Sequence, residues 1–388
     1  MKRIAIVTGT RAEYGLLKPL IFAVREDTDF DLKLLVTGMH LMPEFGNTYK
    51  EIEGDGLRID AMIDDGLDGD SAKAITTSMG RALMGFAEVL AEQKPDLLIV
   101  LGDRTEILTA VTAAMVASIP IAHIHGGETT EGAYDEFIRH AITKMSHYHF
   151  ASTACYRDRI IQMGEDPTRA FNVGAIGIDS IKSLKLLSKS EFEESIGIKL
   201  DKKSALITFH PVTLERATGG SQFGEILKAL DETQDTTLIF TKSNSDKEGR
   251  VINEMIDEYV SKNKDRAVAF TSLGQLRYLS ALKHVDFVVG NSSSGILEAP
   301  YFKTPTINIG DRQKGRLMSE SVISCAPVYK EISEAIVKAV DSVFLSKIQR
   351  QENIYGDGDA TRRIMSELKK IDFSKVKKSF YDIKNIHH

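Results

Sequence analysis

The sequence predicts an α/β protein built from two Rossmann-like domains. Short, continuously apolar runs alternate with amphipathic stretches along the chain, which is the pattern of parallel strands covered by helices on both faces. The alternation pauses around 174–190 and then starts again. A chain of 388 residues is long enough for about two domains of ordinary size. We therefore expect a hinge near 178–190 between two doubly wound domains of similar size.

The first half carries the elements of one such domain. A short apolar run bounded by glycine or polar residues fits a buried strand, whereas a longer amphipathic stretch fits a covering helix. The candidate strands are 3–8, 32–37, 96–102, 119–124, 147–152 and 171–176. The candidate helices are 15–26, 73–93, 105–117, 135–146 and 153–163.

The second half repeats this alternation. The candidate strands are 204–209, 236–241, 267–271, 286–290 and 305–309. The candidate helices are 221–231, 247–261, 274–283, 294–302 and 331–345. From Ala360 onward the pattern is helical at first and then rich in lysine.

Composition excludes several classes of protein. The 49 basic and 55 acidic side chains leave a net charge of −6, which argues against bulk nucleic-acid binding and against a polybasic membrane contact. Two cysteines cannot build a disulfide framework or a four-thiolate zinc site. Since no segment approaches 18 apolar residues and the first apolar run is too short for a signal peptide, we expect a cytoplasmic protein.

Polar residues follow the candidate strands at their carboxyl ends, where open parallel sheets bind ligands. The first such segment, Gly9 to Gly15, is a glycine turn that feeds a helix N-terminus. Such a turn can bind a phosphate, with Arg11 as a further contact. A plain turn with a surface arginine is the alternative. The second segment contains Asp103 and Arg104, and here Asp103 can be a functional carboxylate or simply a helix N-cap.

The third segment is the richest in ionisable groups. His123 and His125 lie two apart on a strand and should share a face, and Gly126 and Gly127 follow them. Three carboxylates come next, which together with the imidazoles suit proton transfer near neutral pH. They are Glu128, Glu131 and Asp135. A metal site formed by the two histidines and a carboxylate is the rival interpretation, although no further ligand spacing supports it.

The second half carries a candidate nucleotide-diphosphate site. His210 ends one strand, and small hydroxyl residues follow another as a phosphate cradle. Glu298 would lie one turn into the next helix and can accept from ribose hydroxyls. The residues of the cradle are Gly290, Asn291, Ser292, Ser293, Ser294 and Gly295. Two cationic residues that could bind the diphosphate, Arg312 and Arg316, lie in a later loop.

Taken together, these motifs resemble the UDP-N-acetylglucosamine 2-epimerase family, and more closely its hydrolysing branch, which feeds sialic-acid and legionaminic-acid synthesis. The resemblance covers most of the chain. The motifs are specific to this family only in combination, and none of them is specific alone. The matching motifs are Gly9-Thr10-Arg11-Ala12-Glu13-Tyr14-Gly15, Val36-Thr37-Gly38-Met39-His40, Gly102-Asp103-Arg104, His123-Ile124-His125-Gly126-Gly127-Glu128, Asp135-Glu136-Phe137-Ile138-Arg139-His140-Ala141-Ile142-Thr143-Lys144, Phe209-His210-Pro211-Val212, Gly290-Asn291-Ser292-Ser293-Ser294-Gly295 and Arg312-Gln313-Lys314-Gly315-Arg316.

The resemblance implies a glycosyltransferase-B-like fold with two domains facing a central cleft. Residues 1–178 would form the acid–base domain, with a helix at 360–386 packing back on it, and 179–359 the nucleotide-diphosphate domain. It further implies a reaction without metal or cofactor, on a nucleotide-sugar substrate, in a homodimer or homotetramer. UDP would leave C1 as a base removes the C2 proton, and water would then add to the glycal with inversion at C2, releasing N-acetylmannosamine.

The resemblance also implies roles for individual residues. Asp103, Asp135 and Glu128 are the proton-transfer candidates, and His210 would lie near the diphosphate. Several relatives carry glutamate where this chain has His125, so the role of that glutamate falls to His125, Glu128 or Glu131. The substrate-binding set is Arg11, Arg104, His210, Asn244, Gly290, Ser292, Ser293, Ser294, Glu298 and Arg316.

Three alternatives stay open. The same reaction could act on a UDP- or GDP-linked 2,4-diacetamido-2,4,6-trideoxy sugar of the legionaminic-acid pathway. A glycosyltransferase would share the fold but require an acceptor, because fold does not fix function. A nucleotide-sugar sensor would bind UDP without chemistry at C2, and the dense cluster of carboxylates and histidines argues against it.

Overall fold

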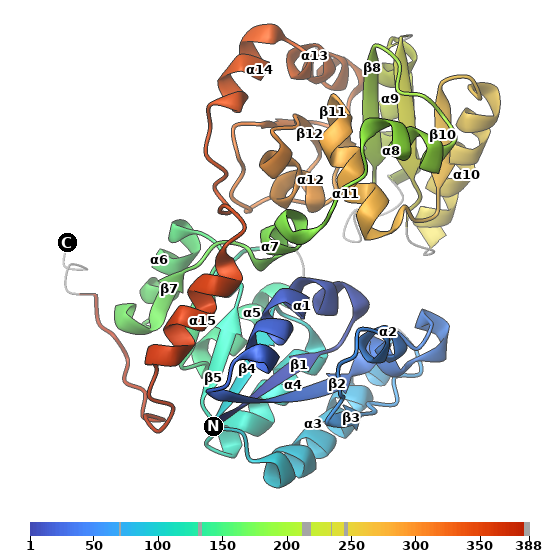
Figure 1. The fold of residues 1–388 in the computed structure, drawn as a ribbon. Helices are drawn as coiled ribbons and strands as arrows, with labels where there is room; N and C mark the ends of the chain where they lie inside the picture. The colour runs from blue at the N-terminus through green and yellow to red at the C-terminus, as the bar shows by residue number, and fades with distance from the viewer. Residues whose placement is uncertain (70, 131–133, 212–218, 234, 244–246, 384–388) are drawn as a thin grey trace. The chain divides into compact units, whose positions relative to one another are not determined.

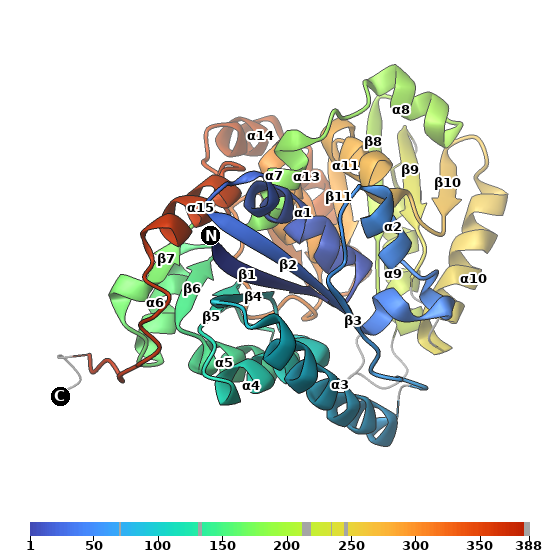
Figure 2. The same ribbon diagram turned by 60° about the horizontal axis from the view of Figure 1, so that its bottom comes forward.

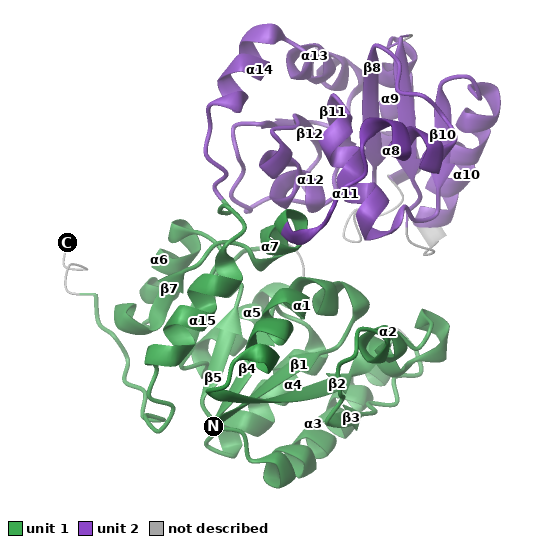
Figure 3. Ribbon diagram, in the orientation of Figure 1, with its two compact units in different colours: residues 1–129, 133–182, 355–388 green, residues 130–132, 183–354 purple. Residues whose placement is uncertain are grey.

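The computed structural model describes residues 1–69, 71–130, 134–211, 219–233, 235–243 and 247–383. The chain divides into two compact units (Figure 3). Unit 1 comprises Met1–Thr129, Ala133–Lys182 and Tyr355–His388, and unit 2 comprises Thr130–Gly132 and Ser183–Ile354. Each unit has its own parallel sheet with covering helices (Figure 1), so the α/β fold class is confirmed.

The sheet of unit 1 has seven strands in the described residues, in the order β3-β2-β1-β4-β5-β6-β7, and all pairings are parallel. All six predicted strands are present, and β3 is an additional strand whose three residues are too few to give a recognisable sequence pattern. The strands are β1 Lys2–Thr8, β2 Phe30–Thr37, β3 Ala61–Ile63, β4 Leu97–Leu101, β5 Ile121–Ile124, β6 Tyr148–Ala151 and β7 Ala170–Asn172.

Helices cover both faces of this sheet (Figure 2). Alternate residues of β1 point to opposite faces: Ile4 packs with α1 and α15, whereas Val7 packs with α3, α4 and α5. The helices are α1 Arg11–Glu26, α2 Tyr49–Gly54, α3 Ala72–Gln93, α4 Thr105–Val116, α5 Asp135–Met145, α6 Ala154–Gln162, α7 Ile176–Ser183 and α15 Ala360–Lys370, with 3₁₀ turns at Gly38–Leu41, Pro43–Phe45 and Pro167–Arg169.

The sheet of unit 2 has six strands in the described residues, in the order β10-β9-β8-β11-β12-β13, again all parallel. The five predicted strands are present, and β13 was missed. The strands are β8 Lys203–Thr208, β9 Thr236–Thr241, β10 Ala267–Phe270, β11 Phe287–Gly290, β12 Thr306–Ile309 and β13 Val322–Cys325.

Two predicted helices of unit 2 are interrupted. A separate 3₁₀ turn, Ala299–Phe302, follows a short α12, because Pro300 lacks the backbone N–H that would continue the helix. Asp341 caps a new helix within the stretch predicted as 331–345. The helices are α8 Lys189–Ile196, α9 Gly219–Asp231, α10 Lys247–Lys262, α11 Gly274–His284, α12 Ser294–Leu297, α13 Tyr329–Ala339 and α14 Ser342–Gln349.

The helix predicted over 360–386 ends at Lys370, and the prediction is wrong for 371–383; residues 384–386 lie outside the described residues. The carboxylate of Asp372 accepts a bond from the backbone N–H of Ser374, 3.1 Å away, a local turn that competes with helix continuation. Residues 375–383, which we call the C-terminal strap, follow without helix or strand. In this strap the Lys378 ammonium donates to the carbonyls of Lys144 and Ser146 (2.6 Å each). The helix α15 itself packs on α1, as expected.

Both sheets have a switch point, where neighbouring strands lead to connections that run in opposite directions. It lies between β1 and β4 in unit 1 and between β8 and β11 in unit 2. Ligands of open α/β sheets bind beyond the carboxyl ends of strands at such points. Among the described residues, no helix is long and apolar enough to cross a membrane.

Candidate active site

His123 is a structural residue beside the switch point of unit 1. Its side chain is buried, Nε2 lies 2.7 Å from the carbonyl oxygen of Gly102, and Nδ1 lies 3.2 Å from Oγ1 of Thr143. Burial lowers the pKa of His123 to about 3, so the ring is neutral. Since both ring nitrogens have partners, His123 joins the end of β4 to α5 and is not placed to bind a metal.

Asp103 forms an ion pair with Arg139. Arg139 is only 4% exposed, and its Nη1 also donates to the carbonyl of Glu128 (3.1 Å) and to Oε2 of Glu136 (3.2 Å). The alternative that Asp103 caps α4 is wrong, because the N-cap residue is Arg104 and no side chain caps this helix. Asp103 therefore lies between β4 and α4 with its carboxylate paired to the Arg139 guanidinium.

Asp135 begins α5 and is half-buried. Burial raises the pKa of this carboxyl above its usual value, while the charges of Arg104 and Arg139 act in the opposite direction. Arg139 follows four residues later and therefore lies one helical turn along the same face. Asp135 thus has the character of a base that binds its proton more tightly than an ordinary aspartate.

His125 and Glu128 turn toward each other. His125 has a φ of +65°, and the backbone N–H of Ile176 donates to its Nε2 (3.3 Å). Nδ1 therefore carries the proton, and it faces Oε1 of Glu128 at 3.3 Å. The same oxygen accepts from Oγ of Ser152 (2.7 Å), and Glu128 is 5% exposed. Glu131, the third candidate, lies outside the described residues.

The double glycine after β5 allows a close backbone approach. Gly127 has a φ of +77°, and a Cβ at this position would lie 2.4 Å from the carbonyl oxygen of Tyr156. Any side chain here would push the loop away from α6. The glycine therefore fixes the path of the loop that carries Glu128.

A second acidic pair lies at the end of β1, and the sequence analysis missed it. The Gly9 N–H donates to Oε2 of Glu13 (2.7 Å), and Glu106 accepts from Nε of Arg104 (2.5 Å). Burial and the nearby charge of Glu106 raise the pKa of Glu13 to about 8. Arg104 is thus held at the switch point, whereas Arg11 is 65% exposed and pairs with Glu51 (2.8 Å) on the surface.

In unit 2, Asn291 forms hydrogen bonds to residues of two other loops. Its carboxamide exchanges two hydrogen bonds with the backbone of His210, at 2.8 and 2.7 Å. Its own carbonyl accepts from Arg312 Nη1 (3.0 Å) and Gln313 Nε2 (2.8 Å). The ends of β8, β11 and β12 are joined in this way. Gly290 allows the approach, since a Cβ there would lie 1.9 Å from the carbonyl oxygen of Thr208.

The His210 ring lies at the end of β8, with Nδ1 3.3 Å from Oγ of Ser243. Asn253 holds Ser243 in place, because its Oδ1 accepts from the Ser243 N–H at 2.8 Å. His210 is therefore oriented by groups of unit 2. Asn244, also predicted to bind substrate, lies outside the described residues.

The serines of the predicted phosphate cradle lie before and at the start of α12, a helix shorter than the one predicted over 294–302. Ser292 Oγ and Ser294 Oγ lie 3.2 Å apart, and Ser294 contacts the hydroxyl of Tyr278. Ser293 precedes α12 without capping it, and this helix has only four residues. Glu298 follows its end, and burial raises the pKa of that carboxyl to about 7.

Two arginines follow β12 in the same loop. Burial and the charge of Arg316 lower the pKa of Arg312. The Nε of Arg316 is buried and, within the described residues, has no hydrogen-bond partner. Two half-buried cations, one with an unused donor, favour a bound anion, since a charge that is partly removed from water needs a compensating partner.

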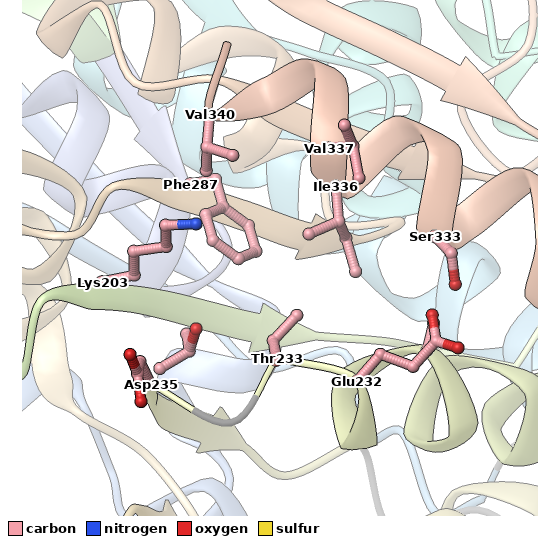
Figure 4. Close-up of a pocket in the computed structure, with 11 residues that line it drawn as sticks. Lys203, Glu232, Thr233, Asp235, Phe287, Ser333, Ile336, Val337 and Val340 are labelled. Atoms are coloured by element: carbon pink, nitrogen blue, oxygen red, sulfur yellow. The ribbon is translucent and has the colours of Figure 1, made fainter.

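A cavity of about 510 Å³ in unit 2 is separate from these groups (Figure 4). Lys203, Thr236 and Phe287 line it, and each is the first residue of its strand. The cavity therefore lies at the amino ends of β8, β9 and β11, whereas His210 and Gly290 lie at the carboxyl ends. We assign it no part in the candidate active site.

Comparison with known proteins decides the family. Residues 22–369 match the family model described as UDP-N-acetylglucosamine 2-epimerase. The chain belongs to the UDP-N-acetylglucosamine 2-epimerase family. It is 44% identical over 322 residues to the GDP/UDP-N,N'-diacetylbacillosamine 2-epimerase (hydrolyzing) of Campylobacter jejuni, covering 83% of this chain and 84% of that protein. It is 40% identical over 390 residues to the polysialic acid biosynthesis protein P7 of Escherichia coli, covering 99% and 98%.

Solved structures of this epimerase family share the fold. The crystal structure described as a UDP-N-acetylglucosamine 2-epimerase of Listeria monocytogenes matches with a TM-score of 0.82 and 20% identity, covering 99% of this chain and 100% of that one. The fold is therefore glycosyltransferase-B-like, with two parallel sheets, as expected.

Proposed function

We propose that the protein is a hydrolysing UDP-N-acetylglucosamine 2-epimerase, which converts UDP-N-acetylglucosamine and water to N-acetylmannosamine and UDP. The observation that carries this proposal is the group at the switch point of unit 1. There the charge of Asp103 is compensated by Arg139, and Asp135 binds its proton more tightly than usual. Two carboxylates in different environments suit a reaction that removes one proton and later delivers another.

The first step is an elimination. Asp135 accepts the proton from C2 of the sugar, the electrons of that C–H bond form a C1–C2 double bond, and the C1–O bond to UDP breaks. The pKa of Asp135, raised by burial, makes this carboxylate a stronger base than an ordinary aspartate. The products of the step are 2-acetamidoglucal and UDP.

The second step is a hydration. Water adds its oxygen to C1 and gives its proton to the ionised carboxylate of Asp103, which delivers a proton to C2 from the face opposite to the one that lost it. Asp135 releases the proton that it took in the first step to solvent before the next turnover. His125 and Glu128 are paired with each other, so we assign them to positioning the loop after β5. Glu131 stays a candidate for proton transfer.

Unit 2 supplies the diphosphate-binding groups in this proposal. Arg312 and Arg316 offer positive charge with an unused donor, and His210 stands at the end of β8 beside Ser243. These groups would stabilise the negative charge that develops on the departing UDP. Ser292, Ser293 and Ser294 supply hydroxyl contacts, and Glu298 accepts from the ribose.

The proposal is tested by product analysis. Purified protein is incubated with UDP-N-acetylglucosamine and water alone, and the products are followed by NMR. We expect N-acetylmannosamine and UDP in equal amounts. Turnover that requires an added acceptor would instead indicate a glycosyltransferase, and UDP binding without any product would indicate a sensor.

A second substrate is favoured by one observation. The Campylobacter jejuni relative, at 44% identity, is named for a diacetylbacillosamine nucleotide, whereas the Escherichia coli relative is named for polysialic acid biosynthesis. We therefore include a nucleotide-linked 2,4-diacetamido-2,4,6-trideoxyglucose in the same assay. Exclusive turnover of that sugar would overturn the N-acetylglucosamine proposal while leaving the reaction type intact. A cytoplasmic setting and a homodimer or homotetramer stay predictions.

A further inference from the structure

We propose that Arg139 is the positioning residue of the acid–base site. It holds Asp103 and the loop after β5 in place relative to Asp135 on α5. This inference rests on the proposed function for the roles of the two aspartates. The contacts of Arg139 themselves do not depend on that function.

Arg139 links three separate segments of unit 1. Its Nη2 pairs with Asp103 at the end of β4, and its Nη1 donates to the carbonyl of Glu128 in the loop after β5. The guanidinium is anchored to its own helix by Glu136, whose second oxygen lies 2.9 Å from Nε2 of His140. A planar guanidinium can make these contacts at once because its donors point in fixed directions.

Ionisable groups face this site from every element packed around it. From α5 come Asp135, Glu136 and His140, and from the β4–α4 segment come Asp103, Arg104 and Glu106. The β5 segment adds His123, which burial keeps neutral, and the paired His125 and Glu128. Within this set Arg104 and Arg139 are the cations whose charges oppose the effect of burial on Asp135.

Loss of the Arg139 charge therefore has a predictable effect on pH dependence. Asp135 acts as a base only when it is ionised, so kcat/KM rises with pH through its pKa. Arg139 lowers that pKa, and its removal raises it. The acid limb of the kcat/KM profile should consequently move to higher pH, and a lysine at position 139 should keep it near its original place.

The experiment compares Arg139→Met, Arg139→Lys and Arg157→Met with the unmodified protein. Arg157 is the matched control: it lies on α6 and donates to the backbone carbonyls of Ala170 (2.8 Å) and Pro167 (3.3 Å), away from the carboxylates of the site. For Arg139→Met we expect kcat to fall about 100-fold, as misplacement of reacting groups does, with KM little changed. Arg139→Lys should restore part of kcat and the position of the acid limb.

The control should lower the melting temperature without moving the acid limb. An Arg139→Met protein whose acid limb is unmoved, with only its melting temperature lowered, would overturn the inference, because Arg139 would then be purely structural. Titration of the Asp135 carboxyl by carbon-13 NMR separates this inference from the proposed function. An upward shift of its midpoint in folded Arg139→Met or Arg139→Gln supports the inference even if no sugar is turned over, and an unchanged midpoint contradicts it.

Discussion

The carboxamide of Asn291 and the backbone of His210 hold each other by two hydrogen bonds, one in each direction. This exchange joins the ends of β11 and β8 at the switch point of unit 2. The orientation of His210 therefore depends on a neighbouring strand as well as on its own loop. The same asparagine accepts from Arg312 and Gln313 through its carbonyl.

Asn291→Leu should weaken UDP binding by up to about 30-fold, since it removes two hydrogen bonds that each contribute about 1 kcal/mol and lets the His210 segment move. Calorimetric titration with UDP measures the effect. Asn263→Leu is the control, because Asn263 also makes two hydrogen bonds in unit 2, to Tyr259 and Arg266, beside β10. It should lower the melting temperature and leave UDP affinity unchanged; equal UDP affinity in both variants would refute the role of Asn291.

Replacement of either aspartate should separate chemistry from binding. Asp135→Asn and Asp103→Asn should each lower kcat about 100- to 10,000-fold, the range for loss of a general acid or base, with UDP affinity nearly intact. Steady-state kinetics and UDP titration measure the two effects. Loss of UDP binding in a folded variant would show that the carboxylates serve the nucleotide instead.

Glu13→Gln should stabilise the protein at neutral and higher pH. The pKa of Glu13 is raised from 4.5 to about 8, so its folded form stays protonated while the unfolded form ionises. Its contribution to stability is full below about pH 4.5 and is lost as pH rises toward 8, at up to about 1.4 kcal/mol per pH unit. Glutamine avoids this loss and can still accept from Gly9.

Thermal unfolding across pH 4 to 9 measures the difference for Glu13→Gln. The stability gap between the variant and the original chain should be near zero at pH 4 and widen up to pH 8. Glu92→Gln, an exposed change on α3, should show no such widening. A constant gap across the range would contradict the raised pKa.

Lys378→Met should release the C-terminal strap. The ammonium of Lys378 lies 2.6 Å from the buried carboxylate of Glu165, which also meets Lys144 and His149. These partners outweigh burial and hold the pKa of Glu165 at about 2. The stabilisation is present above about pH 4.5 and is lost as pH falls toward 2. Loss of one partner should cost about 1–3 kcal/mol at pH 7.

Chemical unfolding measures that cost. The control is Lys375→Met, because Lys375 approaches Asp372 only to 3.9 Å and both side chains are exposed, a geometry that contributes little. If the two variants lost the same stability, the strap would not depend on Glu165.

The sequence predicts the sheets well because buried parallel strands leave continuous apolar runs, such as Leu97–Leu101. It predicts β3 and β13 poorly, since both are short and lie at sheet edges, where partial exposure weakens the pattern. The end of α15 was also missed. A lysine-rich stretch does not indicate which lysine forms an ion pair, so the contact of Lys378 with the buried carboxylate of Glu165 could not be predicted.

The same contrast holds for the candidate site: the places of residues at strand ends can be predicted from the sequence, whereas side-chain pairings cannot. The places of Asp103 and His210 at strand ends follow from the sequence, because apolar runs mark the strands that they follow; their roles stay predictions. The pairing of His125 with Glu128 could not be predicted, since it depends on the positive φ of His125 and on a hydrogen bond from Ile176. Arg139 was overlooked as a site residue, although its spacing of four from Asp135 was the available signal.

The central claim is that chemistry occurs at C2 of an N-acetylglucosamine nucleotide. The most direct measurement is NMR of the product formed from UDP-N-acetylglucosamine in deuterated water. We expect N-acetylmannosamine that carries one deuterium at C2, together with free UDP. A released sugar that keeps its original hydrogen at C2, or UDP release with retained glucosamine configuration, would contradict it.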